Sequence, residues 1–150
     1  MLQKTTELGV NKLIPIETKR SVVKIECNKE KTKIDRWKKI CKEASEQSFR
    51  TDIPEISGIL TLKNLVNLDY DLKLVCSLNK NTKNIKKILE KNNKCVKILL
   101  VVGPEGGFDP LEEEYLLENG FKSVSLGENV LRAETAPVVA LSMINYEFMR

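Results

Sequence analysis

The segment that most constrains the fold is CVKILLVVG, residues 95–103, because its apolar run leaves no polar face. A half-exposed strand alternates apolar and polar side chains, whereas a strand covered on both sides does not. Helical patterns occur on either side of it, at residues 81–92 and 109–120, and another strand pattern follows at 121–127. This alternation predicts an α/β fold with a mainly parallel sheet and helices on both faces.

The rest of the chain supplies the remaining elements of what we expect to be one domain of 150 residues. Helices are expected at residues 2–9, 33–49, 61–68 and 134–149, and strands at residues 11–18 and 71–78. Residues 52–59 are expected to be irregular or a short strand. Pro15 suggests an edge strand or a bulge. One face of the helix at 33–49 collects its apolar and small side chains, Ile34, Trp37, Cys41, Ala44 and Ser48.

The composition excludes several classes of chemistry. The chain has no histidine, which excludes Ser-His-Asp and Cys-His nucleophile systems and HExxH zinc sites. Its four cysteines include no CxxC pair, so reduced thiols in a cytoplasmic protein are expected rather than a zinc knuckle or disulfides. No apolar run is long enough to cross a membrane. Any chemistry must use carboxylates, arginine, lysine, backbone groups or a reactive cofactor.

The charges are distributed unevenly along the chain. Residues 1–100 carry 22 Lys and Arg against 12 Asp and Glu, whereas residues 101–150 carry 3 against 9. A basic first two thirds fits a polyanionic partner such as nucleic acid. A lysine-rich surface kept for solubility is the alternative.

The loop GPEGGF, residues 103–108, is a candidate ligand-binding loop. Its glycines stand at the carboxyl end of the apolar strand, where open parallel sheets bind ligands. Asp109, Pro110 and Glu112 then supply the N-cap, first position and capping box of the next helix. The segment matches neither a P-loop nor a dinucleotide fingerprint, and its acidic residues favour a cationic or neutral ligand. A tight turn with glycines for geometry alone is the alternative.

Residues 121–136 repeat this arrangement. A strand leads to Gly127, a short apolar link and Arg132, and a helix then begins near Glu134. Because neighbouring parallel strands end at the same edge of a sheet, we expect the two glycine loops to share one pocket.

Taken in order, these segments resemble the catalytic domain of the RsmE family. The matching stretches are QKTTELGV, TKRSV, RWKKICKEASEQSFR, GPEGGF and LGENVLRAETA, which span nearly the whole chain. Members of that family are SPOUT-class methyltransferases that methylate N3 of a uridine in small-subunit (16S) ribosomal RNA. The resemblance implies a SPOUT-type α/β domain over residues 1–150 with a C-terminal trefoil knot, a feature almost absent from other proteins.

The resemblance also implies S-adenosylmethionine as cofactor, with S-adenosylhomocysteine as product. The positions that match the family's cofactor-binding residues are Leu78, Gly103, Pro104, Glu105, Gly106, Gly107, Leu126, Gly127, Val130, Leu131, Arg132, Thr135 and Ala136. Because the sulfonium of this cofactor is already activated, no metal is expected, and most of the catalysis is expected from positioning. Arg132 is the candidate for stabilising the uracil anion or holding a phosphate, and Glu134 for a general base or, alternatively, a helix cap.

The candidate RNA-binding residues lie outside these loops. They are Lys19, Arg20, Glu43, Gln47 and Arg50, and a solvated helix end is the alternative for the last three. Related SPOUT enzymes are homodimers, and the apolar helix at 134–149 suits burial in a dimer or in a monomer core. The expected partners are therefore the small ribosomal subunit with its RNA and a second copy of the chain.

Family members also have a PUA-like β-barrel domain and a further strand before QKTTELG, and we expect both to be missing here. Cofactor binding with weakened or absent RNA methylation is the expected consequence. Two alternatives stay open. One is a SPOUT methyltransferase that modifies another atom, such as a ribose 2′-hydroxyl; the other is a non-catalytic RNA-binding or ribosome-assembly module.

Overall fold

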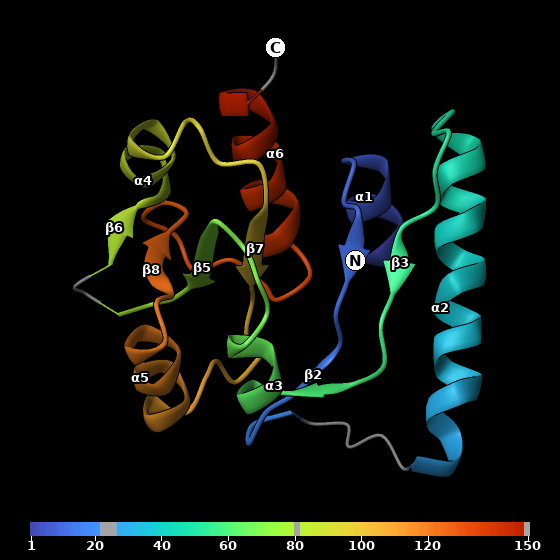
Figure 1. Ribbon diagram of the computed structural model, residues 1–150, viewed down its shortest axis with the longest axis horizontal. Helices are drawn as coiled ribbons and strands as arrows, with labels where there is room; N and C mark the ends of the chain where they lie inside the picture. The colour runs from blue at the N-terminus through green and yellow to red at the C-terminus, as the bar shows by residue number, and fades with distance from the viewer. Residues whose placement is uncertain (22–26, 80–81, 149–150) are drawn as a thin grey trace.

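The computed structural model describes residues 1–21, 27–79 and 82–148. Its main sheet has four strands in the order β6-β8-β5-β7, and every pairing in it is parallel (Figure 1). The strands are β5 (Leu72–Cys76), β6 (Lys83–Asn84), β7 (Ile98–Val101) and β8 (Lys122–Ser125). The predicted parallel α/β arrangement is confirmed, and the short edge strand β6 is an addition to it. The trefoil knot stays a prediction.

Helices cover both faces of this sheet. The helices α3 (Leu62–Val66) and α5 (Pro110–Glu118) pack on one face, and α4 (Ile85–Lys91) and α6 (Ala136–Phe148) pack on the other. In Figure 1 the first pair lies towards the bottom and the second towards the top.

Strand β7 shows why its sequence has no polar face. Leu99 and Val101 are buried in the core beneath α3 and α5, together with Leu116. Ile98 and Leu100 point the other way and pack against the core beneath α4 and α6. Alternate side chains of one strand therefore fill two separate cores, as expected for a strand covered on both sides.

The strand predicted at residues 11–18 is divided in two. Strand β1 (Lys12–Leu13) pairs with β3 (Glu55–Ile56), and β2 (Ile16–Glu17) pairs with β4 (Leu60–Thr61), both in parallel. The division falls at Pro15, which has no amide hydrogen to donate to a neighbour.

The segment that faces this division, between β3 and β4, carries one extra residue. Leu13 pairs with Ile56 but Ile16 pairs with Leu60, so three steps on one side face four on the other. The displaced amide of Ile59 donates a hydrogen bond to Glu30 Oε1 at 3.0 Å. A bulge of this kind bends the strand and interrupts the pairing, so the predicted continuous strand was wrong and the suggested bulge was correct.

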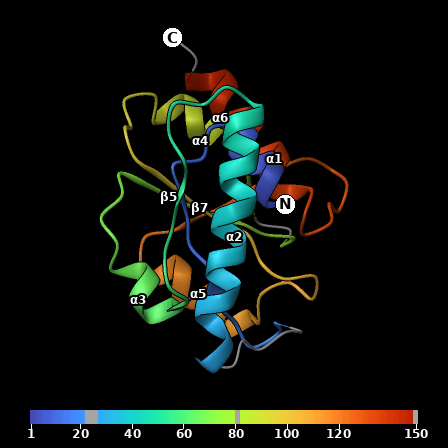
Figure 2. The same cartoon turned by 90° about the vertical axis from the view of Figure 1, so that its right-hand side faces the viewer.

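The long helix α2 (Cys27–Gln47) lies beside the short helix α1 (Leu2–Glu7) and strand β3 rather than on the main sheet (Figures 1 and 2). The predicted face is partly confirmed, because Cys41 and Ala44 are buried while Ile34, Trp37 and Ser48 are half-buried. Within the residues that the structure describes, no helix combines the length and hydrophobicity of a bilayer-spanning segment.

Arg50, just past α2, connects three segments. Its Nη1 donates hydrogen bonds to the carbonyl oxygens of Thr6 at 2.7 Å and Val10 at 3.0 Å. Its Nη2 donates to Asp52 Oδ2 at 2.6 Å. The side chain is only 11% exposed, so it fixes the end of α1 against the end of α2.

We predict that Arg50→Lys lowers the free energy of unfolding by about 2 kcal/mol, because one ammonium cannot reproduce the forked contacts to two carbonyls and a carboxylate. Urea unfolding measures this loss. Asp52→Asn is the matched control and should cost less than about 1 kcal/mol, since Asp52 is largely exposed. Equal losses in the two variants would contradict this role of Arg50.

Candidate functional site

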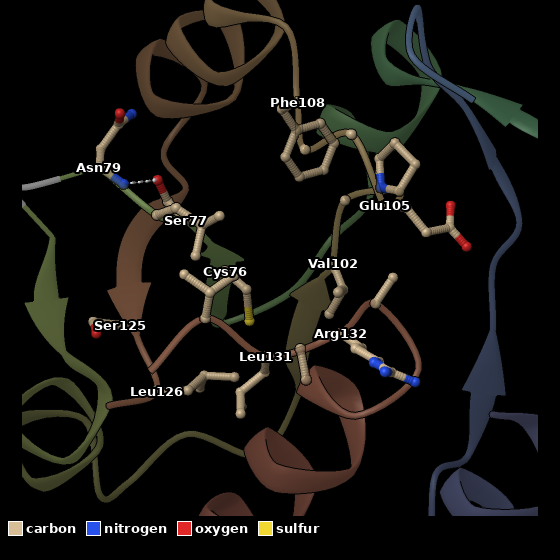
Figure 3. A pocket seen from close by; sticks show the side chains of 18 of the residues that line it. Cys76, Ser77, Asn79, Val102, Glu105, Phe108, Ser125, Leu126, Leu131 and Arg132 are labelled. Carbon is tan, nitrogen blue, oxygen red and sulfur yellow. Dashed lines mark hydrogen bonds between the residues drawn. The ribbon is translucent and has the colours of Figure 1, made fainter. Parts of the chain in front are cut away.

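A cavity of about 770 Å³ opens at the carboxyl ends of three neighbouring strands, β5, β7 and β8 (Figure 3). The lining includes the last residue of β5 and residues 77–79 after it, residues 102–108 after β7, and the end of β8 with most of the loop up to residue 134. The two glycine loops therefore meet in one cavity, as their positions after parallel strands predicted.

Nearly all of the predicted cofactor-binding residues line this cavity. They are Leu78, Gly103, Pro104, Glu105, Gly106, Gly107, Leu126, Gly127, Val130, Leu131, Arg132 and Ala136. Thr135 is not among the lining residues; its amide donates to the Arg132 carbonyl and its carbonyl accepts from Val139, in the first turn of α6. The structure thus gives Thr135 a backbone role.

Several lining residues were not predicted from the sequence. They are Cys76, Ser77, Asn79, Val102, Phe108, Glu113, Val124, Ser125 and Asn129. Most of them follow directly after a strand or adjoin a predicted residue. Their position at a strand end was the signal that could have identified them.

Two glycines of the first loop meet different geometric demands. Gly107 has a φ of +67°, which side chains rarely adopt, and its amide donates to the Pro104 carbonyl at 2.8 Å. A Cβ on Gly103 would lie 3.1 Å from the Phe108 ring, closer than ordinary contact. Gly107 is therefore needed for the backbone turn, and Gly103 for close packing against Phe108.

The helix that follows this loop begins as the sequence predicted. Asp109 is the N-cap of α5, and its Oδ1 accepts a hydrogen bond from the Leu111 amide at 3.1 Å. Glu112 completes the capping box, because its Oε2 accepts from the Asp109 amide at 3.1 Å. The loop is therefore anchored at its C-terminal end.

A turn near the start of the chain holds the same loop from outside. The backbone amide of Lys19 donates to Glu112 Oε1 at 2.7 Å, and its Nζ lies 3.4 Å from Asp109 Oδ1. Arg20 Nη1 donates to the Gly106 carbonyl at 3.0 Å, and Arg20 also lines the cavity. The predicted RNA contacts Lys19 and Arg20 are thus exposed residues placed against the loop.

We predict that Glu112→Ala lowers the free energy of unfolding by about 2 kcal/mol, because it removes a helix cap and a charge-assisted hydrogen bond from a buried carboxylate. Differential scanning calorimetry should show a Tm lower by roughly 4–8 °C. Glu114, two residues further along α5, is exposed, so Glu114→Ala is the control and should leave Tm within about 1 °C. A Glu112→Ala protein as stable as this control would refute the anchoring role.

The second loop turns at Gly127, whose φ is +148°. Ser125 Oγ donates to the Gly127 carbonyl at 2.9 Å, and the Gly127 amide lies 3.3 Å from the same hydroxyl. The carbonyl of Arg132 then accepts from the amides of Thr135 and Ala136 at 2.9 and 3.0 Å, which begins α6. This loop is closed by its own local hydrogen bonds.

Charged side chains of both signs stand at the cavity wall. Arg132, Glu105 and Glu134 are exposed lining residues, and Figure 3 shows the Arg132 guanidinium and the Glu105 carboxylate on the same side of the cavity. In the ranges that the structure covers, the side chains of Arg132 and Glu134 make no hydrogen bond or ion pair. Both are therefore free to contact a ligand, and Glu134 makes no capping bond there.

Cys76 lies in the cavity wall, where Figure 3 shows its sulfur between Leu131 and Ser77. Desolvation by burial raises the pKa of this thiol from its ordinary 9.0 to about 12. The group is therefore a neutral thiol at physiological pH and a poor nucleophile.

We predict that the rate of Cys76 alkylation by iodoacetamide rises about tenfold per pH unit from pH 8 to pH 10, since the thiolate fraction grows without levelling off. The measurement uses a variant in which Cys27, Cys41 and Cys95 are replaced by serine. An ordinary thiol levels off near pH 9, and such a plateau would contradict the raised pKa. The protonated thiol's contribution to stability is complete below about pH 9 and lost as pH rises towards 12.

The remaining predicted RNA contacts lie away from the cavity. Glu43 and Gln47 are exposed on α2, and Arg50 points inward as described above. None of the three lines the cavity. Across residues 1–21, 27–79 and 82–148, no cluster of His, Cys, Asp or Glu is suited to hold a metal ion.

This fold and this cavity are those of an RNA methyltransferase domain. The family model with that description matches residues 1–145, and the chain therefore belongs to the RNA methyltransferase domain family.

Similar proteins of known name narrow the kind of RNA methyltransferase. The chain is similar to ribosomal RNA small subunit methyltransferase E of Bacillus subtilis, with 39% identity over 98% of this chain and 60% of that protein. The enzyme of the same name from Synechocystis is 36% identical over 97% of this chain and 48% of its own length. The resemblance to the RsmE family is confirmed, and the chain spans about half to three fifths of these relatives.

Solved structures agree with these matches. The ribosomal RNA small subunit methyltransferase E of Neisseria gonorrhoeae, bound to S-adenosyl methionine, matches with a TM-score of 0.87 and 32% identity, over 97% of this chain and 58% of that one. A candidate methyltransferase from Legionella pneumophila, solved with the bound cofactor SAM, matches with a TM-score of 0.90 and 35% identity, over 97% and 59%.

Proposed function

We propose that this chain is the catalytic domain of an S-adenosylmethionine-dependent methyltransferase that acts on N3 of a uridine in 16S ribosomal RNA. The observation that supports this most is the cavity formed by two glycine loops at the ends of β5, β7 and β8. Relatives with the same fold carry S-adenosylmethionine and are named for small-subunit ribosomal RNA.

The cavity suits this cofactor in size and in character. Its volume of about 770 Å³ lies within the range of small-molecule sites. Val102, Leu126 and Leu131 give it apolar walls (Figure 3), and the glycines let a ligand approach the backbone closely. Glu105 supplies negative charge towards a ligand that carries a sulfonium and an ammonium group.

The bound cofactor supplies an activated methyl group, and the chain has to place uracil N3 in line with it. The exposed guanidinium of Arg132 is suited to stabilise the negative charge that develops on the uracil ring, or to bind a phosphate. The carboxylate of Glu134, exposed at the same wall, is suited to accept the N3 proton. The thiol of Cys76 stays protonated and does not compete for the methyl group.

The proposed partners are the small ribosomal subunit and a second copy of the chain, in the cytoplasm where that subunit is found. Exposed apolar side chains at the cavity and on α6 support the dimer, namely Leu78, Val130 and Tyr146. Burying such groups against another copy removes apolar surface from water.

The first test is calorimetric titration of the chain with S-adenosylhomocysteine, for which we expect micromolar binding with one site per chain. Gly106→Trp should abolish it, because a Cβ at Gly106 would already contact the Arg20 side chain at 3.5 Å, and an indole would disrupt the Arg20 contact that holds this lining loop. Glu114→Trp, exposed on α5 and outside the lining, is the matched control and should bind normally. No binding by a folded wild-type chain would refute the cofactor assignment.

A second measurement separates the possible targets. Small subunits that lack the modification are incubated with the chain and S-adenosylmethionine, and their nucleosides are analysed by mass spectrometry. 3-Methyluridine supports the proposal, whereas a 2′-O-methyl nucleoside points to the other target atom. RNA binding that needs no cofactor and yields no methylated nucleoside supports a non-catalytic module.

A further inference from the structure

The end of α2 presents one aromatic ring to solvent in an unusual backbone conformation. Phe49 is 94% exposed, and its φ is +57°. Among the described residues it is the only non-glycine residue with positive φ. A bulky side chain in this region costs free energy and is kept only where the surroundings enforce it.

The hydrogen bonds around Phe49 show that glycine would suit this position better. The Arg50 amide donates to the Ser45 carbonyl at 2.9 Å, and the Phe49 amide donates to the Glu46 carbonyl at 3.3 Å. This pair of bonds is the Schellman arrangement that ends many helices, in which the residue at the position of Phe49 is usually glycine. The phenylalanine therefore adds strain and gains no burial in this chain.

The backbone that carries the ring is nevertheless held in place. The Arg50 side chain, next in the chain, is bound to the carbonyls of Thr6 and Val10. Ser48 Oγ, on the other side, donates to the Ala44 carbonyl at 2.7 Å. The ring is thus displayed from a tightly bonded turn, which limits the entropy lost when it binds a partner.

The helix that ends at the ring carries a net positive charge along its length. Helix α2 carries seven Lys and Arg against four Asp and Glu, and its exposed side includes Lys38, Lys39 and Lys42. Gln47, the last residue of α2 and two residues before Phe49, is also exposed. Figure 2 shows α2 on the outside of the molecule, with one side uncovered by other elements. Close to the ring, Lys42 pairs with Glu46 at 3.9 Å, so the lysines that remain to contact phosphate are Lys38 and Lys39, farther back along the helix. An exposed ring beside an amide, with lysines farther along the same helix, suits an unpaired base and the phosphates of neighbouring nucleotides.

We propose that Phe49 stacks on an unpaired base of the RNA substrate, while Gln47 hydrogen-bonds the base and the lysines farther back along α2 contact the phosphates of neighbouring nucleotides. This inference rests on the proposed function in that the substrate is RNA. It transfers the RNA contact expected of Arg50 to the residue before it, since the Arg50 guanidinium is already bound within the chain.

The test compares Phe49→Gly, Phe49→Trp and wild type in thermal unfolding and in binding of a single-stranded 16S RNA fragment. Phe49→Gly should raise Tm by about 2–4 °C, because it relieves the strain, and should weaken RNA binding roughly tenfold, because stacking is lost. Phe49→Trp should keep the wild-type RNA affinity within about threefold. Val96→Ser, at an 88% exposed apolar residue elsewhere, is the control and should change neither.

The outcomes separate this inference from the proposed function. If wild type binds S-adenosylhomocysteine but no RNA, the proposed RNA substrate and the stacking role both fail. If wild type binds RNA and Phe49→Gly binds it equally well, the stacking role alone is overturned. A Tm that falls in Phe49→Gly would show that the ring stabilises the chain and would also overturn the proposal. Unchanged RNA binding with loss of self-association would assign the ring to a protein contact instead.

Discussion

The carboxylate of Glu112 is the group on which the arrangement of the cavity depends. One oxygen accepts from the Asp109 amide and fixes the start of α5, and the other accepts from the Lys19 amide of the N-terminal turn. A buried carboxylate with both oxygens bonded is stabilising because its desolvation is offset by hydrogen bonds, and removing it would leave two amides unpaired. The loop at residues 103–108 is consequently held between α5 and a segment that lies about 90 residues earlier in the chain.

The same turn brings cations to a loop that has none of its own. Arg20 binds the Gly106 carbonyl and Arg132 enters from the second loop, so two guanidinium groups line a cavity whose first loop carries Glu105. A cationic cofactor and an anionic RNA make opposite electrostatic demands on neighbouring surfaces. The proposed function requires both, and the chain supplies an acidic loop and two arginines from different segments of its sequence.

Two adjacent residues at the end of α2 illustrate how position decides a side chain's role. Arg50 has the chemistry of an RNA contact, yet its guanidinium is used for backbone carbonyls of the same chain. Phe49 has the chemistry of a core residue, yet it is exposed because the turn that ends α2 directs it outward. From residue type alone, Arg50 would be placed on the surface and Phe49 in the core, the opposite of what the structure shows.

The sequence by itself determined the features that depend on neighbours in the chain. These include the doubly covered strand at Ile98–Val101, the capping box of Asp109 and Glu112, and the two glycine loops at strand ends. Parallel strands end at one edge, so the pocket itself was predictable. The tertiary structure alone decided that the extra residue of the bulge lies in the segment that faces Pro15, and it alone decided the bond from Lys19 to Glu112 and the inward course of Arg50. Local patterns cannot specify these, because each depends on a partner that only folding of the whole chain brings within hydrogen-bonding distance.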